Sequence, residues 1–395
     1  MVNRRGPDAA ALLRWRYLAI AAAFVFASVL GDHHEGDAEQ VVDGANKLFS
    51  HRPDGGLHLY VAHPELQVGP LAFAVTRFFT AVAAGHELLG LFVGSLVLLL
   101  ATIRCVEATI ADRGSTWVVT LGGIALACWW ADVVPGWAHI DDEIAMWALV
   151  AAVRAVRAAE RWPTHAAFHC GVLIGVGCAA KPWAAFAIAL VAALPRGRRA
   201  LGLAAAVGSA LLLWSPFVIA APETVQALGS FRIDAHDGSL LHALGWSRSP
   251  SWDRPAQLTL ATVLVLLAFR ARRLDLALVG VAIARLLLDG GIYPYYSTEL
   301  VLAGFVADAV RIPNARLRWL GPAPTTIMAA VALQIADRPT GSAFLLTARL
   351  VAFAAVAVTA TVAGQPSGAP GGAATVVWPQ SGAMLRPSRP GATAA

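Results

Sequence analysis

Long apolar segments alternate with short polar or basic segments along almost the whole chain. A helix that crosses the hydrocarbon core of a bilayer needs about 20 mostly apolar residues, and somewhat fewer when neighbouring helices shield it. Segments of this kind lie at 16–31, 86–104, 117–134, 143–160, 165–180, 182–195, 200–221, 256–270, 274–290, 296–311, 318–334 and 343–363. We therefore predict an all-α protein, a polytopic transmembrane helical bundle with roughly 11 to 13 spans.

Residues 69–85 form a further apolar segment whose role this pattern leaves open. Counting it as a span would move the arginines of 104–113 to the other side of the membrane. We interpret it as a re-entrant or interfacial helix, or as half of a broken span. The boundary between 165–180 and 182–195 is also open, because both segments are short and only Lys181 separates them.

The composition excludes an ordinary water-soluble fold. Hydrophobic residues make up 57% of the chain, charged residues make up 14%, and the mean hydropathy is +0.62, whereas soluble domains carry about 25% charged residues. The formal net charge of +5 comes with arginine clusters between the apolar segments, which is typical of cytoplasmic loops rather than of nucleic-acid binding. These clusters lie at 104–113, 154–161, 196–199, 270–273 and 311–318.

The arginine clusters and the first apolar run also predict the orientation of the chain. Four arginines precede that run and no small-residue cleavage pattern follows it, so we predict a retained first helix with a cytoplasmic N-terminus. Residues 1–363 would then form a multi-pass domain of the inner (plasma) membrane, with a first extracytoplasmic loop at 32–68 and an active site facing outside the cytoplasm. The segment 364–395 is rich in Gly, Pro, Ala and Ser, which predicts a disordered cytoplasmic tail.

The first loop begins with acidic residues directly after a span, among them Asp32, Glu35 and Asp37. A carboxylate that is fixed at the end of a helix and partly desolvated suits general-base chemistry, so these three are candidate catalytic residues. The alternative is that they only mark the water interface. Two histidines of the same stretch would add metal ligands, but their spacing is not diagnostic, and we predict no metal site and no cofactor.

The rest of this loop contains a possible amphipathic helix. Apolar residues between positions 41 and 49 recur at helical spacing, which predicts a short helix that either lies on the membrane or simply packs against the protein. His63 and Glu65 follow, just before the next apolar segment. We include both among the candidate substrate-binding residues.

His139, Asp141 and Asp142 form a polar corner at the start of the fourth predicted span. Acidic residues at a helix N-terminus are expected from the helix dipole alone, but three acids, counting Glu143, and a histidine exceed what capping needs. Lys181 interrupts an apolar stretch, and an ionisable residue at membrane depth is costly enough to be a functional candidate. The alternative for Lys181 is that its ammonium reaches the outer interface.

Two later parts of the chain supply further candidates for substrate binding. Arg232, in the loop 221–255, would bind an anionic lipid head group, and a solvated loop is the alternative. Tyr295 and Tyr296 lie in a tyrosine-rich turn between two predicted spans and would continue a polar cavity, although tyrosines at this depth commonly form an interfacial aromatic belt.

The layout resembles the glycosyltransferase-C superfamily. An aspartate shortly after the first span, an amphipathic stretch, and then Tyr60 and a proline-led apolar segment occur in that order. Within the superfamily, the chain is most similar to bacterial transferases that use polyprenyl-phosphate sugars, such as the mannosyltransferases of actinobacterial envelopes. The Lys181-Pro182 element, the Asp141–Asp142 corner and the tyrosine-rich turn resemble the same group.

The resemblance also implies a mechanism. A loop carboxylate takes a proton from the acceptor hydroxyl, which attacks the anomeric carbon of a lipid-phosphate sugar with inversion. By position Asp37 matches this carboxylate best, with Asp32 as the fallback, and Lys181 with an arginine of the loop 221–255 would meet the leaving phosphate. The chain departs from the family where a Tyr-Pro-Pro sequence usually starts the second segment, because residues 68–70 read Val-Gly-Pro here, and it lacks the aromatic residue that follows the catalytic aspartate.

The sequence thus predicts an integral membrane glycosyltransferase that moves mannose or a pentose from a polyprenyl-phosphate donor to an envelope lipid or glycan acceptor. Its expected partners are the donor, the acceptor and the bilayer, with no nucleic acid. One alternative is a transporter or flippase for an envelope lipid, which would concentrate ionisable groups near mid-span and show paired halves. Another is a membrane scaffold without catalysis.

Overall fold

The computed structural model describes residues 7–31, 35–110, 116–310, 322–336 and 342–363, and every regular element in these residues is a helix. The α-helices are α1 (Pro7–Leu30), α2 (Glu35–Leu48), α3 (Leu59–Ala62), α4 (Pro70–Val82), α5 (Glu87–Ile110), α6 (Thr116–Ala131), α7 (Ile140–Arg157), α8 (Pro163–Ala180), α9 (Arg199–Ala220), α10 (Thr224–Ser230), α11 (Leu240–Ala243), α12 (Asp253–Arg270), α13 (Ala277–Leu288), α14 (Pro294–Val310), α15 (Pro324–Ala336) and α16 (Ser342–Ala363). The 3₁₀-helices are η1 (Gly56–His58), η3 (Ala158–Glu160), η4 (Pro182–Ala193), η5 (Arg196–Arg198) and η6 (Leu274–Leu276), and η2 (Asp132–Gly136) is a π-helix. The predicted tail 364–395 lies outside the described residues.

Several helices have the length and composition of membrane spans, as the sequence predicts. Among the described residues, five helices are long and apolar enough to cross a bilayer, namely Glu87–Thr109, Thr116–Gly136, Pro163–Ala180, Arg196–Ala220 and Phe344–Val362. Four shorter apolar helices accompany them, namely Trp15–Leu30, Pro70–Val82, Pro182–Ala193 and Pro324–Ala336. The protein is therefore a helical protein with membrane character, while the predicted number of spans and the particular membrane stay predictions.

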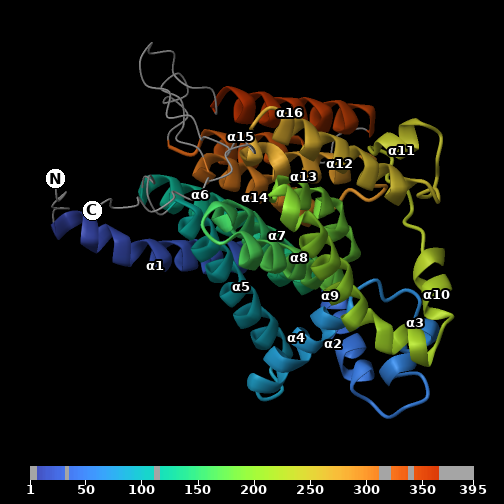
Figure 1. Cartoon of the computed structure of the whole chain (residues 1–395). Helices are drawn as coiled ribbons and strands as arrows, with labels where there is room; N and C mark the ends of the chain where they lie inside the picture. Colours follow the sequence, from blue (N-terminus) through green and yellow to red (C-terminus); the bar gives the residue numbers. More distant parts are fainter. Residues whose placement is uncertain (1–6, 32–34, 111–115, 311–321, 337–341, 364–395) are drawn as a thin grey trace, which may run out of the picture.

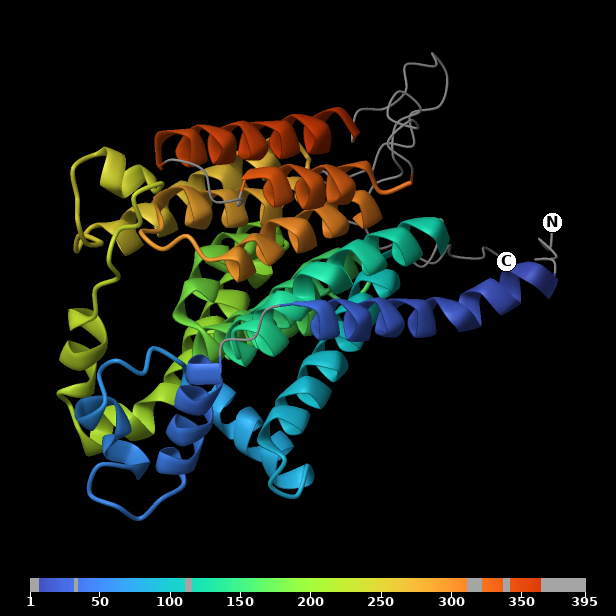
Figure 2. The same ribbon diagram turned by 180° about the vertical axis from the view of Figure 1, so that it is seen from behind.

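The long helices pack side by side into one bundle (Figures 1 and 2). α12 to α16 cover one side, α6 to α9 lie beneath them, and α1 runs along α6. α14 is the most enclosed helix, because every residue from Tyr295 to Ala309 is buried. By contrast α9 exposes apolar side chains such as Leu212 and Ile219, which is the composition of a surface that faces lipid.

Short helices gather at one end of this bundle, which we call the loop end. It carries α2, α3, α10 and α11 (Figure 1). An apolar cluster joins residues of α2, α3 and α4 to Ile140 and Ile144 in the first turns of α7 and to Ala180 at the end of α8. The first loop is therefore packed directly on the ends of the long helices.

The apolar segment at 69–85 forms α4, which turns back into α5 (Figure 2). Its 13 residues correspond to a length of roughly 20 Å at ~1.5 Å per residue, which is shorter than the ~30 Å hydrocarbon core. Ala84 and Gly85, both at positive φ, make the turn. α4 is thus a short helix paired with a long one, within the alternatives that the sequence leaves open.

The chain breaks between α8 and η4 because of Pro182. A residue before proline is pushed out of the α region, and Lys181 is extended, at φ −144° and ψ 120°. The predicted span 182–195 then forms a 3₁₀-helix, Pro182–Ala193, which rises faster per residue than an α-helix. The twelve residues of η4 therefore cover a greater length than twelve residues of α-helix would.

The amphipathic stripe of the first loop packs against protein. Ala38, Val41, Val42 and Ala45 of α2 are buried in the same apolar cluster as Phe73 of α4. Of the two alternatives for this helix, packing is confirmed, because its apolar face meets α4 rather than lying free for the membrane. This contact fixes the position of Asp37 in the first turn of α2.

Candidate functional site

The start of α7 places three carboxyl groups in a buried position at the loop end. His139 is the N-cap residue, and Asp141, Asp142 and Glu143 occupy the first turn. The three acidic side chains are 1%, 2% and 0% exposed. A helix dipole favours acids in its first turn, but a capping role leaves such acids at the surface, whereas these are enclosed by other helices.

Lys181 contacts this acidic turn from the end of α8. Its Nζ lies 2.5 Å from Asp141 Oδ2 and 3.5 Å from Asp142 Oδ2. The extended backbone at Lys181, imposed by Pro182, ends α8 at this point. The structure therefore brings together the two groups that the sequence singles out separately, and Lys181 neutralises part of the acidic turn.

Arg285 enters the same cluster from the last turn of α13. It is 2% exposed and pairs with Glu299 of α14 and with Asp142, whose Oδ1 is 3.4 Å from a terminal guanidinium nitrogen. Its guanidinium lies over the rings of Trp183 and Tyr296, at 4.6 and 4.3 Å from their centroids. Such stacking suits the flat, weakly hydrated guanidinium and holds Arg285 in place.

Aromatic side chains cover the opposite side of the acidic turn. The His139 ring stacks on Tyr295 at a centroid distance of 4.2 Å, and Tyr295 stacks on Tyr293 at 5.6 Å. Trp137 packs against both tyrosines at 5.7 Å. The tyrosine-rich turn is thus part of the buried cluster rather than an aromatic belt at a lipid interface.

Gly69 ties the first loop to this cluster. Its backbone N–H donates to the carbonyl of Ala180 at 2.8 Å, one residue before Lys181. A Cβ at this position would overlap the carbonyl oxygen of Ala179, so only glycine permits so close an approach. Residues 68–70 read Val-Gly-Pro instead of the Tyr-Pro-Pro that is usual in the family. The close approach to Ala179 explains why position 69 is glycine.

Tyr60 of α3 lies beneath the same junction. Its hydroxyl donates to the carbonyl of Val68 at 2.9 Å, and its ring packs on Trp214 and Phe217 of α9. Burial raises the pKa of the Tyr60 phenol well above its ordinary value, and the negative charge of Asp141 raises it further. The Tyr60 phenol of the first loop and the Asp141 carboxylate of α7 are therefore close enough to interact electrostatically.

Asp37 is close enough to the tyrosine-rich turn for its charge to act on Tyr293. It lies half-buried in the first turn of α2. The pKa of Tyr293 is raised first by burial, then by the charge of Asp289 and then by that of Asp37. Tyr293 stacks on Tyr295 and Tyr295 on His139, so the tyrosine on which the charge of Asp37 acts belongs to the aromatic side of the acidic turn.

The remaining predicted site residues lie elsewhere or cannot be placed. Asp32 lies outside the described residues, as does the side chain of Glu35. His63 pairs within its own loop with Glu65 at 3.2 Å and Asp54 at 3.7 Å. Arg232 is exposed and donates to the carbonyls of Gly229 and Phe231, so the described contacts of these residues are local.

The structure adds several residues that the sequence analysis does not name as site residues. Trp183 Nε1 donates to Asp142 Oδ1 at 2.6 Å, and Arg254 at the start of α12 lies 3.2 Å from Asp289 Oδ2. Sequence reasoning had a signal for Glu299, because an acid inside an apolar segment is costly unless it is paired. Trp183 becomes visible only when its partner is known, and Arg254 is one of the arginines of the loop 221–255 that the sequence offers for binding an anionic head group.

Buried acids outnumber buried bases in the described part of this cluster. Asp141, Asp142, Glu143, Asp289 and Glu299 face Lys181, Arg285 and the partly exposed Arg254, that is, five carboxyl groups and three cations. A small hollow of about 20 Å³, the size of a single water site, lies beside it, lined by Trp183, Glu299 and apolar side chains of α7, α13 and α14. The arrangement offers a base, cations and an apolar surface at one place.

No protein-family model matches the sequence, and a search of curated proteins found no significant match.

Proposed function

We propose that the protein is an integral membrane glycosyltransferase. It transfers mannose or a pentose from a polyprenyl-phosphate donor to an envelope lipid or glycan acceptor, with inversion at the anomeric carbon. The observation that carries the proposal is the attachment of the first loop next to the buried ion pair: Gly69 N–H donates to the carbonyl of Ala180 at 2.8 Å, one residue before Lys181, whose ammonium lies 2.5 Å from Asp141.

Asp37 acts as the general base in this proposal. It is half-buried, which leaves it accessible to an acceptor hydroxyl while limiting its solvation. A positioned base of this kind accelerates proton transfer by about 10²- to 10⁴-fold. The rigid packing of α2 on α4 holds the carboxylate in place, and the acceptor oxygen forms the new bond to the sugar as its proton moves to Asp37.

The cations at the cluster bind the leaving phosphate. Lys181 donates to Asp141, and an ammonium has three N–H donors, so Lys181 keeps donors for a phosphate oxygen. Arg254, 45% exposed and oriented by Asp289, supplies a second positive charge at the same end of the bundle.

A transporter or flippase is the second candidate, and the position of the ionisable groups favours the enzyme. A transport path places binding residues near mid-span, between repeats. Here the acids lie in the first turn of α7, at the C-cap of α13 and, for Glu299, in the second turn of α14, and Lys181 lies at the C-cap of α8. The charged residues are thus gathered at helix ends.

A transferase assay tests the proposal. Membranes containing the protein are incubated with radiolabelled polyprenyl-phosphate mannose and, separately, with polyprenyl-phosphate arabinose, and lipid and glycan products are separated. The proposal expects label in a new product of inverted configuration. Movement of the intact lipid across sealed vesicles, without any labelled product from either donor, would instead support the transporter and contradict the proposal.

A further inference from the structure

We propose that His139, Asp141 and Asp142 bind a divalent metal ion. Binding itself does not depend on the proposed function, whereas the role of the ion, which is to let an anionic phosphate approach this acidic cluster, rests on it. The ligand set consists of one imidazole nitrogen and two carboxylate oxygens.

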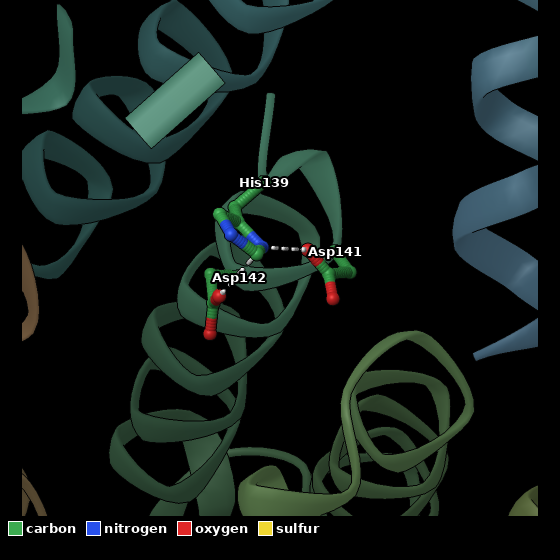
Figure 3. A group of neighbouring side chains, drawn as sticks. All are labelled: His139, Asp141 and Asp142. Carbon is green, nitrogen blue, oxygen red and sulfur yellow. Dashed lines mark ion pairs between the residues drawn. The ribbon is translucent and has the colours of Figure 1, made fainter. Parts of the chain in front are cut away.

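The geometry of the three side chains fits a single ion. One ligand atom from each residue lies within 4.8 Å of the others, and metal–ligand bonds of ~2.0–2.2 Å separate two ligands of one ion by up to about 4 Å, so small side-chain rotations suffice. Figure 3 shows the His139 ring directed toward both carboxylates at the start of α7. His139 Nδ1 is 3.5 Å from Asp141 Oδ1 and 3.8 Å from Asp142 Oδ2.

The same three atoms lack hydrogen-bond partners among the described residues. They are His139 Nδ1, Asp141 Oδ1 and Asp142 Oδ2, and all three are buried. Asp141 and Asp142 are at least 98% buried, and buried carboxylate oxygens are nearly always hydrogen-bonded. A cation between the three residues would satisfy all of them at once.

The charge of the acidic turn supports the same conclusion. Lys181 is shared between Asp141 and Asp142, and Arg285 is shared between Asp142 and Glu299. Two cations are thus divided among three carboxyl groups, and Glu143 lies in the same turn as a further buried acid. Buried carboxylates require pairing or metal coordination, and a divalent ion supplies the missing positive charge.

The surroundings of His139 suit a metal ligand. The ring is held by stacking on Tyr295 at 4.2 Å, and an oriented imidazole is a better ligand than a mobile one. Mixed imidazole and carboxylate ligands suit ions such as Mn²⁺ or Zn²⁺. Lys181 contacts Asp141 through Oδ2 at 2.5 Å, the oxygen that the proposed ion does not use, and lies 3.5 Å from Asp142 Oδ2, which the ion would also approach. Lys181 and the ion therefore repel each other across Asp142.

Mn²⁺ binding to the purified full-length protein tests this inference. The protein is placed in nanodiscs of neutral phosphatidylcholine, and free Mn²⁺ is measured by electron paramagnetic resonance. We expect one saturable Mn²⁺ per chain, at least tenfold weaker binding in Asp141→Asn and Asp142→Asn, and equal or tighter binding in Lys181→Met. Asp253→Asn is the matched control, because Asp253 is a buried aspartate at the same end of the bundle outside the three ligands, and it should bind as wild type.

Two further measurements guard against misfolding. His139→Gln changes a residue that is 19% exposed and should fold while losing Mn²⁺ affinity, and Mn²⁺ should raise the unfolding temperature of the wild type but not of His139→Gln. Absence of saturable binding in the wild type, or wild-type affinity in folded Asp141→Asn and His139→Gln, would overturn the inference. No donor or acceptor is present, so these results are independent of whether the protein is a transferase.

Discussion

Lys181 Nζ lies 2.5 Å from Asp141 Oδ2, across 40 residues of sequence. The contact joins the C-terminal end of α8 to the N-terminal end of α7, both of which border the apolar cluster of the first loop. It is a buried ion pair, since Asp141 is 1% and Lys181 14% exposed. Removing one partner of such a pair leaves the other as an uncompensated buried charge.

Lys181→Met should therefore destabilise the protein strongly. We expect a loss of about 3–5 kcal/mol, because Asp141 loses its nearest cation and Asp142 loses one of the cations beside it, and a partial recovery when Mn²⁺ is added. Thermal unfolding in nanodiscs measures both effects, with Lys47→Met as a control, since Lys47 forms an exposed pair with Asp43. An unfolding temperature equal to that of the wild type would show that Lys181 does not stabilise the acidic turn.

Gly69→Ala should separate the first loop from the end of α8. The new Cβ would overlap the Ala179 carbonyl, and overpacking of this kind costs about 1–3 kcal/mol. We expect transferase activity to fall further than stability does, because Asp37 and Lys181 would no longer be held together. Gly208→Ala is the control, since nothing lies near Gly208 and alanine is the better helix former by roughly 0.5–1 kcal/mol.

Asp37→Asn should lower the pKa of Tyr293. The charge of Asp37 contributes to raising that pKa, so its removal must shift the value back toward the ordinary one. The raised pKa stabilises the folded state below the pKa of an unfolded tyrosine, about 10, and this contribution is lost as the pH rises beyond it. Ultraviolet titration of tyrosinate measures the shift, with Tyr293→Phe to identify the group among five tyrosines. An unchanged titration would place Asp37 away from the cluster.

Much of the helical pattern could be predicted from the sequence. The segments 165–180 and 343–363 correspond to α8 and α16 within a few residues, because apolar runs bounded by proline or basic residues leave little choice. The 3₁₀ form of Pro182–Ala193 could not be predicted, since its alanine- and leucine-rich sequence suits an α-helix equally well. For α2, the apolar stripe predicted an amphipathic helix but not the surface against which that stripe packs.

The sequence predicted which types of residue form the candidate site, but only some of the contacts between them. Charged groups in apolar surroundings, such as Lys181 and the Asp141–Asp142 pair, stand out because burial of charge is costly. Their pairing depends on packing of distant segments, as for Arg285 and Asp142, which lie 143 residues apart. Trp183 became a site residue only through its contact with Asp142, whereas Glu299 carried a sequence signal as an acid inside an apolar segment.

The most direct test of the account compares the transferase activity of Asp37→Asn with that of Asp43→Asn. Both residues lie on α2, but Asp43 faces outward and pairs with Lys47 at 2.7 Å. The account predicts that Asp37→Asn loses about 10²- to 10⁴-fold in kcat and that Asp43→Asn keeps wild-type activity. Full activity in Asp37→Asn would contradict the central claim that this carboxylate and the Lys181–Asp141 cluster form one active site.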